Sequence, residues 1–285
     1  MFFIAMLCFD AMGLIIKYLS QGYSAAELSA YRNFFGLIPS LIALWWAKEW
    51  RAAGANWRLR QWRLAVLRGV CITFAQFSFY LSLALMSFAT AQTISYAVAL
   101  FTVAFAVPVL SERVGPVRWA AVGVGFAGVV WVMRPGADAF SWVAVLPLIA
   151  AALYAMAGVL SRRFDEEAPS ALVNIWSTGV STIGSVALVF ALGGFREIAS
   201  MEDLAFIVAM GCFGGCAVLC WVVAHRQTEP ANLAPFNYFG IPLAFWLGWI
   251  FFDEAPWSDL FPGAILIVAG GLIILWRERR APKAK

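Results

Sequence analysis

The chain has 285 residues, of which 63% are hydrophobic and 13% are charged, and its mean hydropathy is +0.82. Soluble domains average about 25% charged residues, so this composition excludes a soluble globular protein and indicates a polytopic membrane protein. The net charge of +4 does not indicate a nucleic-acid partner, because Lys and Arg gather in the connections between apolar segments, where they report on membrane topology.

Ten apolar segments are long enough to cross about 30 Å of hydrocarbon, which takes roughly 20 helical residues. Continuous apolar runs without period-two alternation favour helices, whose backbone groups are satisfied internally. We therefore predict an all-α fold with ten transmembrane helices, at residues 2–20, 27–47, 64–86, 90–110, 117–133, 142–161, 170–192, 204–224, 230–251 and 259–276. Asp10 and Lys17 favour a transmembrane span over a signal peptide for the first segment.

The distribution of Lys and Arg predicts the orientation of the chain. With a cytoplasmic N-terminus, the inner connections and the C-terminal tail hold 15 Lys and Arg residues and the outer connections hold 3. Because positive residues concentrate on the cytoplasmic side of a membrane protein, we expect both termini to be cytoplasmic.

An internal repeat divides the chain into two halves. The stretch from Met86 to Met133 recurs 142 residues later, so that Tyr96 aligns with Tyr238 and Ser111-Glu112 aligns with Asp253-Glu254. We assign the first five-helix repeat to residues 1–136 and the second to residues 137–285, which includes a short basic tail. Five spans per half make the second repeat inverted, which is typical of secondary transporters with a substrate site near the midplane.

At this level the sequence resembles the drug/metabolite transporter superfamily, in particular its EamA-type ten-helix members. The resemblance covers the whole chain and rests on Arg32, Arg68-Gly69, Ala84-Leu85, Thr90-Ala91, Ser111-Glu112-Arg113, Gly128 and Arg134-Pro135-Gly136. It implies a basket-like helix bundle with a central cavity, no ATPase, and transport of a small metabolite. We expect export of aromatic or other hydrophobic amino acids, because aromatic residues occur at the expected cavity walls. The alternative within the family is a carrier of the riboflavin or S-adenosylmethionine type.

Aromatic and hydrogen-bonding residues inside the spans are the candidates for a substrate site, since such sites combine apolar walls with a few polar groups. These candidates are Phe9, Asp10, Gln76, Tyr80, Tyr96, Tyr154, Asn237 and Tyr238. The alternative for each aromatic residue is ordinary helix packing or an interfacial belt.

Three charged residues lie inside the predicted spans. Asp10 is costly within a membrane and should face the bundle interior, where it serves proton coupling or binds a substrate amine, or forms a structural ion pair with Arg32 or Arg68. For the two arginines the alternatives are such a pair, an extended side chain that reaches the headgroups, or capture of a substrate carboxylate.

Several patterns do not indicate catalysis or cofactor binding. Gly123 to Gly128 spells GxGxxG but lies inside an apolar span, where glycines let helices approach closely. One histidine and no catalytic motif in a usable context argue against an intramembrane enzyme acting on lipid, so we expect no enzyme activity, no cofactor and no metal. A channel remains a further alternative. We expect a monomer in the bacterial inner membrane.

Overall fold

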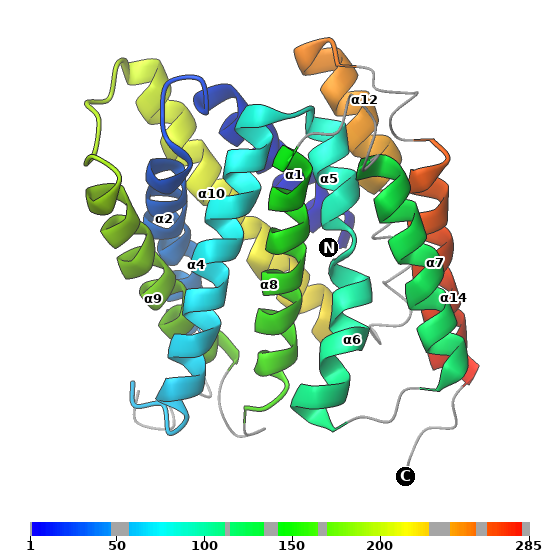
Figure 1. The fold of residues 1–285 in the computed structure, drawn as a ribbon. Coiled ribbons are helices and arrows are strands. Elements are labelled where there is room, and N and C mark those ends of the chain that lie inside the picture. Colours follow the sequence, from blue (N-terminus) through cyan, green and yellow to red (C-terminus); the bar gives the residue numbers. More distant parts are fainter. Residues whose placement is uncertain are drawn as a thin grey trace.

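The computed structural model describes residues 2–46, 57–111, 115–133, 142–164, 170–227, 240–254 and 261–280, and within these ranges the regular structure is helical (Figure 1). The helices are α1 (Phe2–Leu19), α2 (Ala25–Trp46), α4 (Trp62–Leu85), α5 (Phe88–Ser95), α6 (Val98–Leu110), α7 (Pro116–Met133), the short 3₁₀ helix η1 (Trp142–Ala144), α8 (Val145–Ser161), α9 (Ser170–Ala191), α10 (Met201–Gln227), α12 (Gly240–Phe252) and α14 (Gly263–Arg280).

Each of the ten predicted spans contains helix, which confirms the predicted fold class. For the first eight spans the helix bounds agree with the prediction within three residues. The fourth span is interrupted at Tyr96 and Ala97, between α5 and α6. There the Ala97 amide donates to the Ile94 carbonyl at 3.0 Å, a tighter i→i−3 bond than an α-helix makes. The ninth span is described only from Gly240, where α12 begins.

The helices have the length and surface of membrane spans. By length and hydropathy, five described segments are able to cross a membrane, namely Trp62–Leu85, Phe88–Leu110, Trp142–Ser161, Leu172–Ala191 and Met201–Val218. Large apolar side chains such as Ile183 and Phe190 on α9 are exposed on the outside of the bundle, and Trp45, Trp46 and Trp142 are exposed at helix ends. Apolar outer surfaces with tryptophans near the ends are what a lipid bilayer favours.

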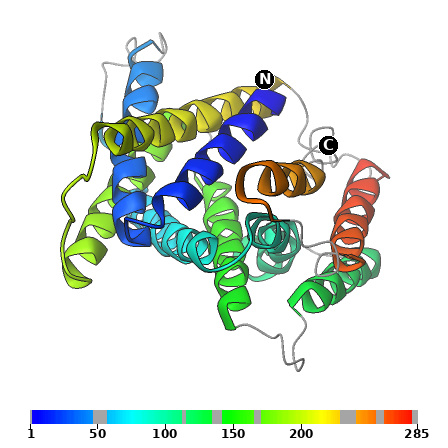
Figure 2. The ribbon, with the colours of Figure 1, turned by 90° about the horizontal axis from the view of Figure 1, so that it is seen from above.

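The helix contacts follow a two-fold pattern when the spans are numbered in chain order. The contact of α1 with α10 has a counterpart in that of α8 with α4, and the contact of α2 with α10 has one in that of α9 with α4. In the pairs α2–α9 and α7–α14, each helix contacts the helix at the same position in the other half. Figure 2 shows α7 and α14 side by side at one edge of the bundle and α1 lying along α10 at another.

The α7–α14 contact depends on glycines. A Cβ added at Gly128 would lie 2.6 Å from the Gly263 carbonyl oxygen, and one at Gly270 would lie 2.7 Å from the Ala121 carbonyl oxygen. Gly270 and Gly263 stand 142 residues after Gly128 and Ala121, so each contact maps onto the other by the repeat. Glycine lets two membrane helices approach to backbone contact, as expected for Gly128 of the GxGxxG stretch, whereas a Cβ added at Gly123 would meet no atom within 4 Å.

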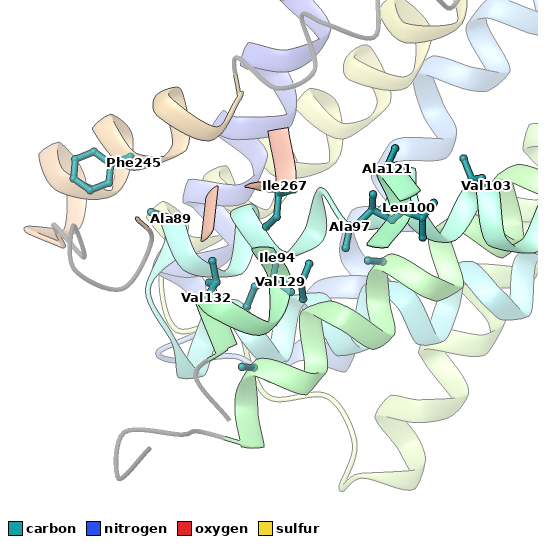
Figure 3. Packing of buried hydrophobic residues seen from close by; sticks show 13 residues of the cluster. Ala89, Ile94, Ala97, Leu100, Val103, Ala121, Val129, Val132, Phe245 and Ile267 are labelled. Atoms are coloured by element: carbon teal, nitrogen blue, oxygen red, sulfur yellow. The ribbon is translucent and has the colours of Figure 1, made fainter. Parts of the chain in front are cut away.

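A buried apolar cluster beside this pair joins α7 and α14 to α5, α6 and α12 (Figure 3). It includes Ile94, Leu100, Val129, Phe245 and Ile267. The cluster anchors the helices that carry the interruption at Tyr96.

Ser111 and Asp253 end α6 and α12 with the same backbone conformation. Their φ angles are 57° and 53°, in the left-handed region that is uncommon for residues other than glycine. The two residues align in the repeat, so both copies end the helix in the same way and place a glutamate next in the chain.

Candidate functional site

Asp10 lies on α1 and is almost fully buried, with 4% of its surface exposed. Its Oδ1 accepts a hydrogen bond of 3.3 Å from Gln92 Nε2 on α5. The two helices are close here, because a Cβ added at Gly13 would lie 3.0 Å from the Phe88 ring. Among the described residues Asp10 forms no ion pair, so the alternative of a structural pair with Arg32 or Arg68 is not what the structure contains.

Arg32 lies on α2, and 9% of its surface is exposed. Its Nη1 donates to Asn33 Oδ1 at 3.0 Å, while its Nε is sealed from solvent without a hydrogen-bond partner. The guanidinium lies against α10 and α1, because a Cβ added at Gly214 would be 2.9 Å from Arg32 Nε and 2.9 Å from Met12 Sδ. Arg32 therefore points into the bundle and does not extend to the headgroups.

Two tyrosines lie near this guanidinium. Tyr80 on α4 is buried and Tyr154 on α8 is half-buried. The Tyr154 hydroxyl is within electrostatic range of Tyr80, and both are within range of Arg32. The structure thus brings two of the predicted aromatic residues together with a charged group from a third helix.

Gln76 belongs to a polar network between α2, α4 and α9 that reaches Arg32 through Asn33, whose Oδ1 also accepts from Arg32 Nη1. Its Oε1 accepts from Ser29 Oγ at 3.0 Å and from Asn33 Nδ2 at 2.7 Å, and its Nε2 donates to Asn33 Oδ1 at 3.1 Å. Ser181 and Ser185 on α9 complete the network. Because both ends of the Gln76 amide are satisfied by protein groups, the network accounts for this residue as an interhelical contact.

Tyr96 lies at the interruption between α5 and α6, and its hydroxyl contacts the start of α12 at Gly240. A side chain at Gly240 would occupy the space of that hydroxyl. Phe9 on α1 is half-buried against the cluster that contains Tyr80 and Phe88. Asn237 and Tyr238 lie outside the described residues, so their predicted place in the site stays a prediction.

An ion pair lies at one end of the bundle, the end predicted to be outside. Lys17 Nζ on α1 lies 2.6 Å from Glu254 Oε1 and 2.8 Å from Glu254 Oε2, and it also donates to the Met86 carbonyl at 2.9 Å. Glu254 Oε2 accepts from the Phe88 amide at 2.9 Å, at the N-terminus of α5. Lys17 lies 5.1 Å from the centre of the Phe252 ring. This Lys17–Glu254 clasp ties α1 and the α4–α5 turn to the end of α12.

In the described part of the chain, no group of three His, Cys, Asp or Glu side chains is placed to hold a metal ion. Cys8 on α1 lies near Cys216 and Cys220 on α10, and these cysteines are free thiols.

Residues 1–134 and 141–276 match the EamA-like transporter family. The chain belongs to this family. It is therefore a polytopic membrane protein of a transporter family, as the resemblance to the drug/metabolite transporter superfamily implied. A solved crystal structure with 22% sequence identity has the same fold, with a TM-score of 0.67 over 98% of this chain and 96% of that one.

Named relatives of this EamA-family chain are transporters of two kinds. A riboflavin transporter of Rhizobium johnstonii is 30% identical over 171 residues, which are 60% of this chain and 56% of that protein. An S-adenosylmethionine uptake transporter of Rickettsia bellii is 24% identical over 285 residues, which are 100% of this chain and 95% of that protein. The alignment thus spans just over half of the riboflavin transporter and nearly all of the S-adenosylmethionine transporter.

Sequence reasoning about this EamA-family chain missed the Lys17–Glu254 clasp and the role of Gln92. The sequence did single out Glu254, because the repeat aligns it with Glu112. The partner could not be read, since Lys17 lies 237 residues away. Gln92 had no comparable signal, because its contact with Asp10 depends on how α1 crosses α5.

Proposed function

We propose that this EamA-family protein is a secondary transporter of the bacterial plasma membrane that carries S-adenosylmethionine or a close analogue. The observation that carries the proposal is the full-length similarity to S-adenosylmethionine uptake transporters, which covers 100% of this chain and 95% of the Rickettsia bellii protein. A second relative with that name, from Rickettsia conorii, is 25% identical over 285 residues. Similarity along the whole chain includes both halves, between which the substrate site of such a carrier lies.

Riboflavin is the second candidate. The identity of 30% to the Rhizobium johnstonii transporter favours it, but that alignment covers 60% of this chain. Export of aromatic amino acids was our expectation from the aromatic residues of the spans. The named relatives support the riboflavin and S-adenosylmethionine alternative better, and the same aromatic residues suit the flat rings of either compound.

Transport would proceed by alternating access between two inverted five-helix halves, residues 1–136 and 137–285. The two-fold pattern of helix contacts and the shared left-handed residues Ser111 and Asp253 support two equivalent halves. The Lys17–Glu254 clasp is formed at one end.

The substrate would lie among Phe9, Asp10, Tyr80, Tyr96 and Tyr154, with Asn237 and Tyr238 expected to join from the second half. Gln76 is better assigned to helix packing, because its amide is satisfied by Ser29 and Asn33. We further expect a monomer with cytoplasmic termini.

Counter-flow in proteoliposomes tests the function. Vesicles preloaded with unlabelled S-adenosylmethionine should take up the labelled compound in a saturable way, and vesicles preloaded with riboflavin should not. Exchange of riboflavin alone would show that riboflavin, and not S-adenosylmethionine, is the substrate. Linear, non-saturating flux would contradict a carrier and favour a channel.

A further inference from the structure

Arg32 carries a charge inside the bundle that the described protein does not balance. A guanidinium stays protonated in proteins, and an uncompensated charge within the membrane is costly. Only 9% of Arg32 is exposed, and its Nε has no hydrogen-bond partner. Of its nitrogens, Nη1 has a partner, and that partner is the neutral amide oxygen of Asn33.

Neither nearby acid neutralises Arg32. Asp10 receives its hydrogen bond from Gln92 and forms no ion pair in the described part of the chain. Glu27, one and a half turns before Arg32 on α2, accepts instead from the Ser24 amide at 2.8 Å and the Arg196 amide at 2.6 Å. Within the described residues, a structural ion pair therefore does not account for Arg32.

The surroundings of Arg32 are shaped to hold its side chain in place. Gly214 on α10 leaves the space that Arg32 Nε occupies, since a Cβ there would approach it to 2.9 Å. Tyr80 and Tyr154 lie within electrostatic range and come from α4 and α8. The guanidinium thus lies against α10 and α1 with nitrogen donors still available, and within electrostatic range of a tyrosine on α4 and one on α8.

We propose that Arg32 binds the carboxylate of the transported substrate. The planar guanidinium matches a carboxylate with two parallel hydrogen bonds, and an entering carboxylate supplies the missing negative charge. This inference rests on the proposed transport function and narrows it to metabolites with an ionised carboxylate. S-adenosylmethionine has one in its amino-acid moiety and riboflavin has none.

Ligand pairs that differ by the carboxylate test the proposal without relying on a variant. In the counter-flow assay we would compare inhibition by S-adenosylmethionine with its decarboxylated form, and by tryptophan with tryptamine. The wild-type protein should prefer the carboxylate form of the transported compound by about 10- to 100-fold, the size of a hydrogen-bonded interaction with a charged group. Equal inhibition by both forms would overturn the proposal.

Variants then test whether Arg32 causes the preference for the carboxylate form. Arg32→Gln should bind the carboxylate form about 10- to 100-fold more weakly and the decarboxylated form as before, and Arg32→Lys should keep part of the preference. Arg68→Gln is the matched control, because Arg68 Nε and Nη1 also lack partners within the span. Thermal unfolding in detergent checks that each variant is folded. Equal weakening of both forms in Arg32→Gln, or loss of the preference in Arg68→Gln alone, would contradict the role of Arg32.

The outcomes separate this proposal from the proposed function. Exchange of tryptophan alone, with a preference that depends on Arg32, would replace the substrate and keep the carboxylate site. Exchange of riboflavin alone would keep a transporter and overturn the carboxylate site.

Discussion

Replacing Glu254 with glutamine should open the end of the bundle that the Lys17–Glu254 clasp holds closed. The substitution keeps the size of the side chain and removes its charge. Lys17 Nζ now lies 2.6 Å and 2.8 Å from the two Glu254 oxygens, and Phe88 N lies 2.9 Å from one of them. A neutral amide can replace part of this hydrogen bonding but not the ion pair, so the closed conformation should lose stability relative to the open one.

The burial of the clasp determines how much free energy the closed conformation loses when the ion pair is removed. Exposed ion pairs contribute about 0.2–1 kcal/mol, whereas removing one partner of a buried pair costs about 3–5 kcal/mol. The Lys17 and Glu254 side chains are 11% and 28% exposed, which places this pair between the two cases, at about 2 kcal/mol. Since 1.4 kcal/mol corresponds to a factor of ten, the open population should rise roughly 30-fold.

Accessibility of a cysteine beneath the clasp measures this change. Ala91 on α5 is fully buried in the apolar cluster that also contains α1 residues, so Ala91→Cys in a cysteine-free background should react slowly with a membrane-impermeant maleimide. Adding Glu254→Gln should raise the labelling rate roughly 30-fold. Asp253→Asn is the matched control, because Asp253 is an exposed neighbouring acid without an ion pair in the described residues, and asparagine tolerates its positive φ.

A double-mutant cycle of Glu254→Gln with Lys17→Met separates the interaction energy of the pair from the cost of leaving one charge unpaired. A coupling energy of about 1–2 kcal/mol is expected, within the range for residues in direct contact. Labelling of the Glu254→Gln protein at the wild-type rate, with the protein folded, would refute the assignment of this pair as a clasp.

Three further changes test the packing and the site. Gly128→Ala should lower the free energy of unfolding by about 1–3 kcal/mol, because its Cβ would meet α14 backbone at 2.6 Å. Gly123→Ala, whose Cβ would meet no atom within 4 Å, should be neutral or slightly stabilising in thermal unfolding. Equal effects of the two substitutions would contradict the close approach of α7 and α14. Gly240→Ala should displace the Tyr96 hydroxyl and weaken transport as Tyr96→Ala does, and normal transport by both would remove Tyr96 from the site. Asp10→Asn should abolish the pH dependence of flux while substrate binding persists, and an unchanged pH profile would argue against proton coupling through Asp10.

Composition and periodicity were sufficient for the fold because the bilayer constrains it strongly. A span must be apolar, helical and about 20 residues long, so the first eight spans could be placed within three residues of the helices. The interruption at Tyr96 was not predicted. It lies in an apolar run, Tyr96 to Phe101, with no Gly or Pro to mark it, and the Tyr96 hydroxyl there lies at the start of α12 at Gly240.

The site could be predicted only in part, because sequence position does not determine which neighbour a side chain meets. Gln76 and Tyr80 are one helical turn apart on α4 and were predicted to face a common cavity. In the structure Gln76 is bound by α2 and α9, while Tyr80 lies near Arg32 and Tyr154. The Gln76 amide is occupied by interhelical hydrogen bonds that its position on α4 could not show.

The repeat also explains why sequence could not show which end of the bundle is closed. Each half carries a glutamate at the corresponding position, Glu112 and Glu254, so the sequence is compatible with a clasp at either end. The relative populations of the two conformations are determined by a free-energy difference of a few kcal/mol between them. A clasp worth about 2 kcal/mol is strong enough to select a conformation and weak enough for substrate binding to reverse the choice. The Lys17–Glu254 pair is therefore better understood as a reversible contact of one transport state than as a permanent brace of the fold.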